Sequence, residues 1–178
     1  MRTVKDNWYI LTGGPCSGKT TTLDALKKKG YKVVYEAARF LIDQEMKKGK
    51  TLQEIRKDEL AFQRKVLEIK LEWEKSLTKN ELTFFERGIP DSLAYYKLCG
   101  VSDDPFLKTA LRNSFYKKVF LLEPLDYQKD YARVESEAER KQLGQLLEEA
   151  YQNIGVPVIR VLKMSLEKRV KFVLRNLQ

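Results

Sequence analysis

Residues 8–21 read WYILTGGPCSGKTT, a short apolar run followed by a loop rich in glycine. The apolar part, residues 8–12, contains aromatic and β-branched residues and predicts a strand that stops at Gly13. Residues 18–29 predict a helix that is closed by Gly30. The intervening residues 13–20 match the pattern G-x-x-x-x-G-K-[ST], and they lie between a strand and a helix as that pattern requires. The sequence therefore predicts a loop that binds the phosphates of a nucleotide.

The specified positions of this phosphate loop have physical reasons. Gly13 and Gly18 allow backbone conformations in which successive N–H groups point into one concavity, and the next helix begins with unpaired N–H groups at its positive dipole end. We expect Lys19 to reach the β- and γ-phosphate oxygens and the Thr20 hydroxyl to bind Mg²⁺. The predicted nucleotide-binding residues are Gly13, Gly14, Pro15, Cys16, Ser17, Gly18, Lys19, Thr20 and Thr21.

Strand-like and helical segments alternate along the rest of the chain. We expect further strands at residues 31–36, 82–86, 119–122 and 158–162, and helices at 37–48, 91–98, 105–113, up to 153 and after Ser165. Parallel neighbouring strands need crossover connections, so this order predicts a three-layer α/β/α fold with a five-stranded, mostly parallel sheet. We find no repeat or linker, and we expect one domain over residues 1–178.

Two helical apolar patterns support this interpretation. Residues 37–48 place Phe40, Leu41 and Ile42 on an apolar side. Thr51 is a plausible N-cap for one long helix, in which aromatic and aliphatic residues recur every three or four positions. We interpret that stripe as facing the core; its members are Phe62, Val66, Ile69, Trp73 and Leu77.

Composition narrows the possible chemistry. The chain has 178 residues, two cysteines and no histidine, which excludes His-dependent nucleophilic triads and His-ligated zinc. Any general base is therefore Asp, Glu, Lys or Tyr. The net charge of +9 favours an anionic partner, although it also serves solubility. No apolar run is long enough to span a membrane and the cysteines are few, so we expect a soluble, cytoplasmic protein.

Two carboxylates follow predicted strands. Glu86 ends a mostly apolar run that we expect to lie beside the first strand, so it is a candidate Mg²⁺ ligand, directly or through water. The alternative is an ordinary acid at a strand end. Glu36 follows the second strand and is the best candidate general base, because an acceptor hydroxyl near the γ-phosphate would need such a group. Its alternative role is that of a carboxylate at a helix N-terminus.

Basic residues lie beside these carboxylates. Arg87 is a candidate for neutralising charge on the transferred phosphoryl group, or else it forms a salt bridge with Glu86 or Glu36. Arg39 and Asp91 are candidate contacts to the acceptor substrate.

A polar, charge-dense segment follows the fourth predicted strand. Residues 124–140 contain Arg133 and Arg140, and a lid here that closes on the phosphates would exclude water and bring Arg133 into the catalytic site. The competing interpretation is a solvated helix face.

The chain resembles P-loop NTPases of the small kinase-like group. More narrowly, it resembles the predicted-ATPase domain family that includes the ribosylnicotinamide kinase domain of the bacterial NAD regulator. The motifs that carry the resemblance are GGPCSGKTT from residue 13, YEAAR at 35–39, FFERGIPDSLAYY at 84–96 and VFLLEP at 119–124, with RVE at 133–135 and a helix end at 151–155. The resemblance implies the P-loop NTPase fold.

Deoxynucleoside kinases share part of this pattern. They use a Glu after the second strand as base and an E-R-S segment after the third, and Glu36 and Glu86-Arg87 match those positions, although Gly88 stands where the serine would be. The resemblance implies transfer of the γ-phosphoryl group of ATP to a hydroxyl of a small, nucleoside-like acceptor, with ATP and Mg²⁺ bound.

Two other functions remain open from the sequence. One is an ATPase regulated by a partner, with no small-molecule acceptor. The other is a polynucleotide 5′-end kinase, prompted by the net charge of +9 and by the basic C-terminal helix. It is not favoured, because no stacking-aromatic motif or recognition helix is evident. The sequence does not indicate an oligomeric state.

Overall fold

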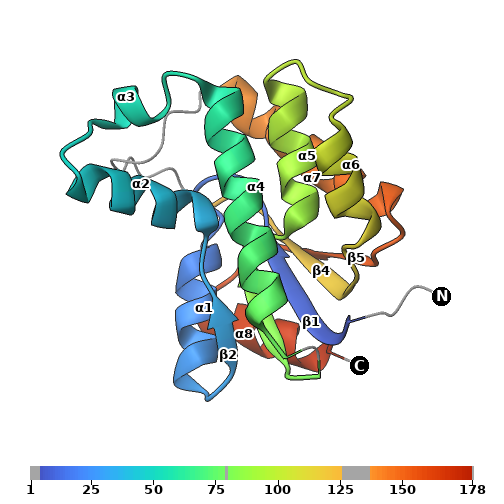
Figure 1. Cartoon of the computed structure of the whole chain (residues 1–178). Helices are drawn as coiled ribbons and strands as arrows, with labels where there is room; N and C mark the ends of the chain where they lie inside the picture. Colours follow the sequence, from blue (N-terminus) through green and yellow to red (C-terminus); the bar gives the residue numbers. More distant parts are fainter. Residues whose placement is uncertain (1–4, 79, 126–136, 178) are drawn as a thin grey trace.

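A five-stranded parallel sheet forms the centre of the molecule (Figure 1). The computed structural model describes residues 5–78, 80–125 and 137–177. All four strand pairs are parallel and the strand order is β2-β3-β1-β4-β5, which confirms the predicted sheet. The strands are β1 (Lys5–Thr12), β2 (Lys32–Val34), β3 (Thr83–Glu86), β4 (Tyr116–Leu122) and β5 (Val158–Val161).

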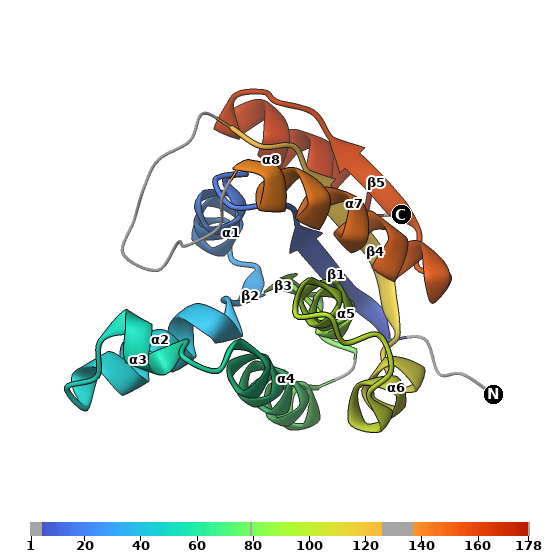
Figure 2. The same ribbon diagram turned by 90° about the horizontal axis from the view of Figure 1, so that it is seen from above.

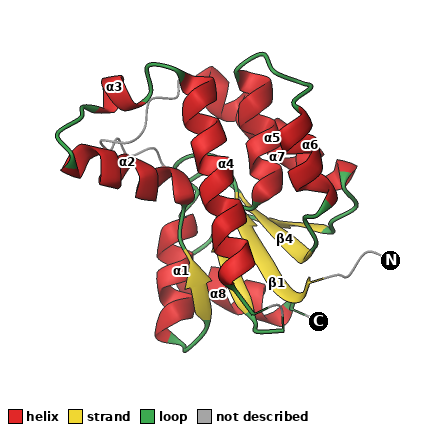
Figure 3. Cartoon of the chain, viewed as in Figure 1, coloured by secondary structure: helices red, strands yellow, loops and turns green. Residues whose placement is uncertain are grey.

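Helices connect the strands (Figure 3). The described part of the chain contains α1 (Lys19–Lys28), α2 (Ala37–Lys47), α3 (Leu52–Ile55), α4 (Glu59–Ser76), α5 (Ile89–Leu98), α6 (Pro105–Arg112), α7 (Glu137–Asn153) and α8 (Leu166–Arg175). Figure 2 shows α1 and α4 on opposite sides of the sheet, and α2 and α3 extending away from it. The three-layer α/β/α arrangement predicted from the sequence is confirmed.

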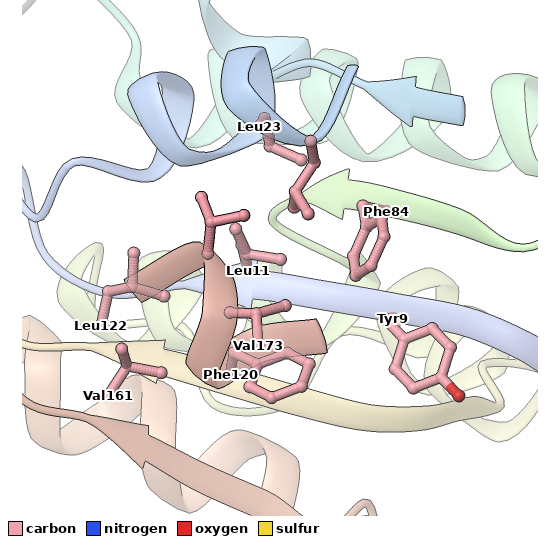
Figure 4. Close-up of a cluster of buried hydrophobic side chains, with 10 residues drawn as sticks. Tyr9, Leu11, Leu23, Phe84, Phe120, Leu122, Val161 and Val173 are labelled. Atoms are coloured by element: carbon pink, nitrogen blue, oxygen red, sulfur yellow. The ribbon is translucent and has the colours of Figure 1, made fainter. Parts of the chain in front are cut away.

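Alternating side chains of β1 build a core on each face of the sheet. Tyr9 and Leu11 pack in a cluster with residues of α1 and α8, such as Leu23 and Val173 (Figure 4). Trp8 and Ile10 point to the opposite face, which α5 and α7 help to cover. Because residues 8–12 of β1 are buried, residues 8–11 form an uninterrupted apolar run, as is typical of the central strand of a parallel sheet.

The strand boundaries differ from those predicted. β1 begins at Lys5 and β4 at Tyr116, each three residues earlier than expected, because strand pairing extends past the apolar run that marked each strand. β2 is shorter than predicted, with three residues. Phe40 was expected on the apolar side of its helix, yet it is 43% exposed and contacts the ring of Trp73 instead of the core.

The long helix predicted from Thr51 is wrong, because two helices replace it. Thr51 caps only α3, through a reciprocal capping box with Glu54. Asp58 then caps α4 by accepting a hydrogen bond from the Ala61 N–H at 2.9 Å. Asp58 accepts from an N–H group that has no partner within the first turn of α4, so a second helix can begin there. The chain therefore turns between α3 and α4.

Candidate active site

The phosphate loop connects the end of β1 to the start of α1. Gly13 has a φ of +142°, and a Cβ there would lie 2.4 Å from the Leu122 carbonyl oxygen at the end of β4. Gly18 is the N-cap of α1 with a φ of +74°. Only glycine fits both positions without strain or collision, which explains the two glycines of the motif.

Lys19 folds back onto the loop that precedes it. Its ammonium donates to the carbonyl oxygens of Gly13 and Gly14 at 3.2 and 3.0 Å, and to the Ser17 hydroxyl at 3.3 Å. Burial and the nearby Arg87 lower the pKa of Lys19 to about 8, although neighbouring carboxylates oppose the change. An anion beside this ammonium would favour its charged form.

Thr20 and Glu86 meet at the carboxyl end of the sheet. The Thr20 hydroxyl donates to the two Glu86 carboxylate oxygens at 2.8 and 3.0 Å. This pairing brings the phosphate loop to the end of β3, which lies beside β1 as predicted. Burial and the charge of Glu36 raise the pKa of Glu86, so a nearby cation would be needed to stabilise its ionised form fully.

Arg87 forms ion pairs with two carboxylates. Its Nε donates to Glu36 at 2.7 Å and its Nη1 to Asp91 at 3.0 Å. Arg87 adopts a φ of +63°, unusual for a residue with a side chain, while its N–H extends the pairing of β3 to the Leu11 carbonyl. Such backbone strain is concentrated at functional sites.

Asp91 is fully buried and holds Arg87 in place. Its Oδ1 also accepts from the Thr12 hydroxyl at 2.5 Å, and its Oδ2 accepts from the Gly88 N–H at 2.9 Å and from the Tyr151 hydroxyl. Because Asp91 has 0% exposure, we interpret it as a positioning residue for Arg87. The direct contact of Asp91 to an acceptor substrate stays a prediction.

Glu36 is ionised at neutral pH. Burial by itself would raise its pKa, but Arg87 and Lys19 outweigh that effect and lower it to about 2. The salt bridge between Arg87 and Glu36, one of the alternatives derived from the sequence, is therefore present. Glu36 is also the N-cap residue of α2, although its side chain makes no capping hydrogen bond.

One cleft joins most of the predicted site residues. Its cavity has a volume of about 140 Å³. The predicted residues that line it are Pro15, Cys16, Ser17, Gly18, Lys19, Thr20, Thr21, Glu36, Arg39, Glu86 and Arg87. Gly13, Gly14 and Asp91 lie outside this lining.

The opposite wall contains residues that sequence reasoning missed as site residues. They come mainly from α4 and its neighbours and are Ala38, Ile42, Arg56, Phe62, Gln63, Val66, Lys70 and Tyr95. Phe62 and Val66 belong to the stripe interpreted as core, and both are indeed buried, but they also line the cleft. Lys70 and Gln63 gave the only available signal, as polar residues beside an apolar helical stripe.

The C-terminal helix contacts the back of the phosphate loop. Arg169 of α8 donates to the carbonyl oxygens of Ser17 and Gly18 at 3.3 and 3.4 Å, and to the Met164 carbonyl at 3.2 Å. Arg169 was not predicted as a site residue. Arg133 and most of the predicted lid at 124–140 lie outside the described residues.

Solved structures of kinases share this fold. Deoxyadenosine kinase from M. mycoides with bound dATP superimposes with a TM-score of 0.65 and 16% identity, covering 96% of this chain and 98% of that chain. Thymidylate kinase from Ehrlichia chaffeensis superimposes with a TM-score of 0.66 and 13% identity, covering 97% of this chain and 98% of that chain. Shikimate kinase from Acinetobacter baumannii in complex with shikimate superimposes with a TM-score of 0.59 and 16% identity, covering 98% of this chain and 93% of that chain. Comparison with curated protein sequences finds no significant match.

The phosphate loop and the sheet together define a P-loop NTPase. Its fold is that of the small kinase-like group, as the sequence resemblance predicted. The chain belongs to the AAA domain family, whose model matches residues 8–169. Among the described helices, none is sufficiently long and apolar to cross a membrane.

Proposed function

We propose that this protein is a kinase that transfers the γ-phosphoryl group of ATP to a hydroxyl of a small acceptor in the cytoplasm. The observation that carries the proposal is the single cleft shared by Lys19, Glu86, Glu36 and Arg87. A phosphate loop, a carboxylate beside its threonine, and a second carboxylate paired with an arginine provide the groups that phosphoryl transfer to a hydroxyl needs.

The donor side of the cleft suits a magnesium nucleotide. Mg²⁺ prefers oxygen ligands and keeps several waters, so one hydroxyl, one carboxylate and the substrate phosphates are a sufficient ligand set. The Thr20 hydroxyl and Glu86 carboxylate already contact each other, and Glu86 is buried, so both fit this role. When bound there, Mg²⁺ would neutralise charge on the β- and γ-phosphates. Lys19 would exchange loop carbonyls for phosphate oxygens.

The acceptor side supplies groups that orient a hydroxyl. Glu36 would accept a hydrogen bond from the acceptor hydroxyl, whose oxygen bonds to the γ-phosphorus while the bond from phosphorus to the ADP oxygen breaks. In a loose transition state the proton leaves late, so the low pKa of Glu36 is compatible with orienting the hydroxyl and then taking its proton.

Arg87 would stabilise charge on the transferred group. Its two carboxylate partners fix the guanidinium, and a fixed cation needs no reorganisation during the reaction. Arg39 lines the same cleft and is the remaining candidate for contact with the acceptor.

The test is Mg²⁺-dependent ADP release by the wild type and Lys19→Ala, with and without a panel of hydroxyl acceptors. Lys28→Ala is the matched control, because Lys28 is exposed at the end of the same helix. We expect one acceptor class to stimulate ADP release in the wild type and the control, and not in Lys19→Ala. Turnover that no acceptor changes would contradict the kinase and favour an ATPase regulated by a partner.

A further inference from the structure

Lys70 is a buried cation in the wall of the cleft. It lies on α4 and is 7% exposed. Its ammonium donates to the Gly88 carbonyl at 2.9 Å and to the Ser92 hydroxyl at 3.1 Å. An ammonium has three donors, and both of these partners are neutral. Among the described residues, no carboxylate accepts a hydrogen bond from Lys70.

Two arginines of the cleft have ionic partners, which Lys70 lacks within the described part of the chain. Arg87 has two carboxylate partners, and Arg56 pairs with Glu59 at 2.7 Å. Lys19, like Lys70, donates only to neutral groups among the described residues, but these are the carbonyl oxygens and the hydroxyl of the phosphate loop, where the donor phosphates would bind. Five basic and two acidic residues line the cleft, so its walls have an excess of positive charge.

Keeping a charged ammonium in this position is costly. Charged groups that are buried without an ionic partner lose hydration that neutral hydrogen bonds replace only in part. Burial accordingly lowers the pKa of Lys70 to about 8, even though Asp91, Glu36 and Glu74 oppose that change and only Arg87 adds to it. An anion in the cleft would remove this penalty.

We propose that the phosphoryl acceptor is itself an anion, a hydroxyl compound with a phosphate monoester or a carboxylate group, and that Lys70 binds this group. The proposal rests on the kinase function proposed above and names its substrate class. A neutral nucleoside would leave Lys70 without an ionic partner, whereas a nucleoside monophosphate or a hydroxy acid would pair with it. The expected contact is a charge-assisted hydrogen bond, which is among the strong polar interactions in proteins.

A purely structural role for Lys70 is the alternative to exclude. Its two hydrogen bonds join α4 to the first turn of α5, and a variant without a donor could fail to fold. Lys70→Gln keeps a neutral donor for the Gly88 carbonyl, and Lys70→Arg keeps the charge. Lys65→Gln is the matched control, because Lys65 is exposed on the same helix.

The experiment measures acceptor binding by calorimetry in the presence of Mg²⁺ and a non-hydrolysable ATP analogue. The probes are matched pairs: adenosine, thymidine and guanosine with their 5′-monophosphates, and shikimate with its methyl ester. Thermal unfolding of each variant verifies that it is folded.

We expect the wild type, Lys65→Gln and Lys70→Arg to bind the charged member of one pair about 10- to 100-fold more tightly than the neutral member. In Lys70→Gln this ratio should fall close to one. The pair that responds distinguishes a phosphate monoester from a carboxylate.

Three outcomes would overturn the inference: tighter binding of a neutral member, a charge preference that Lys70→Gln retains, or no binding of any charged probe. The kinase function is tested separately by ADP release with the same probes. If a neutral acceptor stimulates ADP release, the kinase stands and the anionic acceptor is rejected. If a charged probe binds without stimulating ADP release, the kinase function fails while the anion site remains.

Discussion

Replacing Arg87 by methionine tests whether the buried carboxylates depend on its charge. The Arg87 side chain is 4% exposed and the Asp91 side chain 0%, so their ion pair is shielded from solvent. Methionine keeps much of the side-chain volume but leaves Asp91 buried with only the neutral donors Thr12, Gly88 and Tyr151. Removing one partner of a buried pair costs about 3–5 kcal/mol.

Unfolding experiments give the magnitude of this effect. For a chain of this size, 1 kcal/mol shifts the melting temperature by about 2–4 °C, so we expect Arg87→Met to melt roughly 6–20 °C below the wild type. The control is Arg160→Met, whose side chain is 66% exposed and pairs with Glu148. That exposed pair should contribute less than about 1 kcal/mol.

The double variant Arg87→Met/Asp91→Asn separates the structural role of Arg87 from its catalytic role. If the two charges are coupled, the double variant should be about 0.5–3 kcal/mol more stable than the sum of the single effects allows. Acceptor-dependent ADP release should nevertheless stay at least about 10³-fold below the wild type, because the cation at the phosphoryl group is missing. A loss below about 1 kcal/mol in Arg87→Met, or strictly additive effects, would refute the reasoning.

The phosphate loop and Glu86 beside it can be tested in three further ways. The affinity of the free enzyme for ATP should fall as the pH rises through about 8, because the pKa of Lys19 is lowered to that value and only protonated Lys19 attracts the polyphosphate. Calorimetry at pH 7 and pH 9 checks this prediction, and equal affinities at the two pH values would contradict it. Glu86→Gln should raise the Mg²⁺ concentration for half-maximal turnover at least about tenfold, and chelation of the metal should abolish wild-type turnover. In urea unfolding, Gly18→Ala should lower the stability of the protein more than Gly30→Ala does. Both glycines have a positive φ, but of the two only residue 18 would place a Cβ against Arg169, 2.2 Å from its Nη1. Equal losses of stability would show that the collision is relieved.

Local patterns predicted the parts of the molecule that local chemistry determines. The phosphate loop has fixed spacing, and β1 is marked by an apolar run between breakers, so both could be found without tertiary information. The approach of Glu86 to Thr20 followed from one further rule, that the carboxyl ends of parallel strands meet at one edge. Their hydrogen bonds agree with that expectation.

The opposite wall of the cleft could not be predicted in this way. Apolar residues at helical spacing look the same whether they face a core or a substrate, so Phe62 and Val66 were interpreted as core alone. The sequence shows Lys70 only as a polar residue beside the apolar stripe, and that its two hydrogen-bond partners are neutral is known from the structure alone. The burial of Asp91 could not be predicted either, because it depends on Tyr151 of α7, which is distant in the sequence.

The strand order has a consequence for how the chain folds during synthesis. β1 is followed in sequence by β2, but it pairs with β3 and β4, and Trp8 meets its β3 partner Thr83 only 75 positions later. At about 5–20 residues per second, this central apolar strand waits roughly 4–15 s on the ribosome for its first neighbour. During that interval residues 8–11 are exposed to chaperones and to aggregation, and the phosphate loop has no sheet edge to hold it. The contact of Thr20 with Glu86 can therefore form only after β3 has been made.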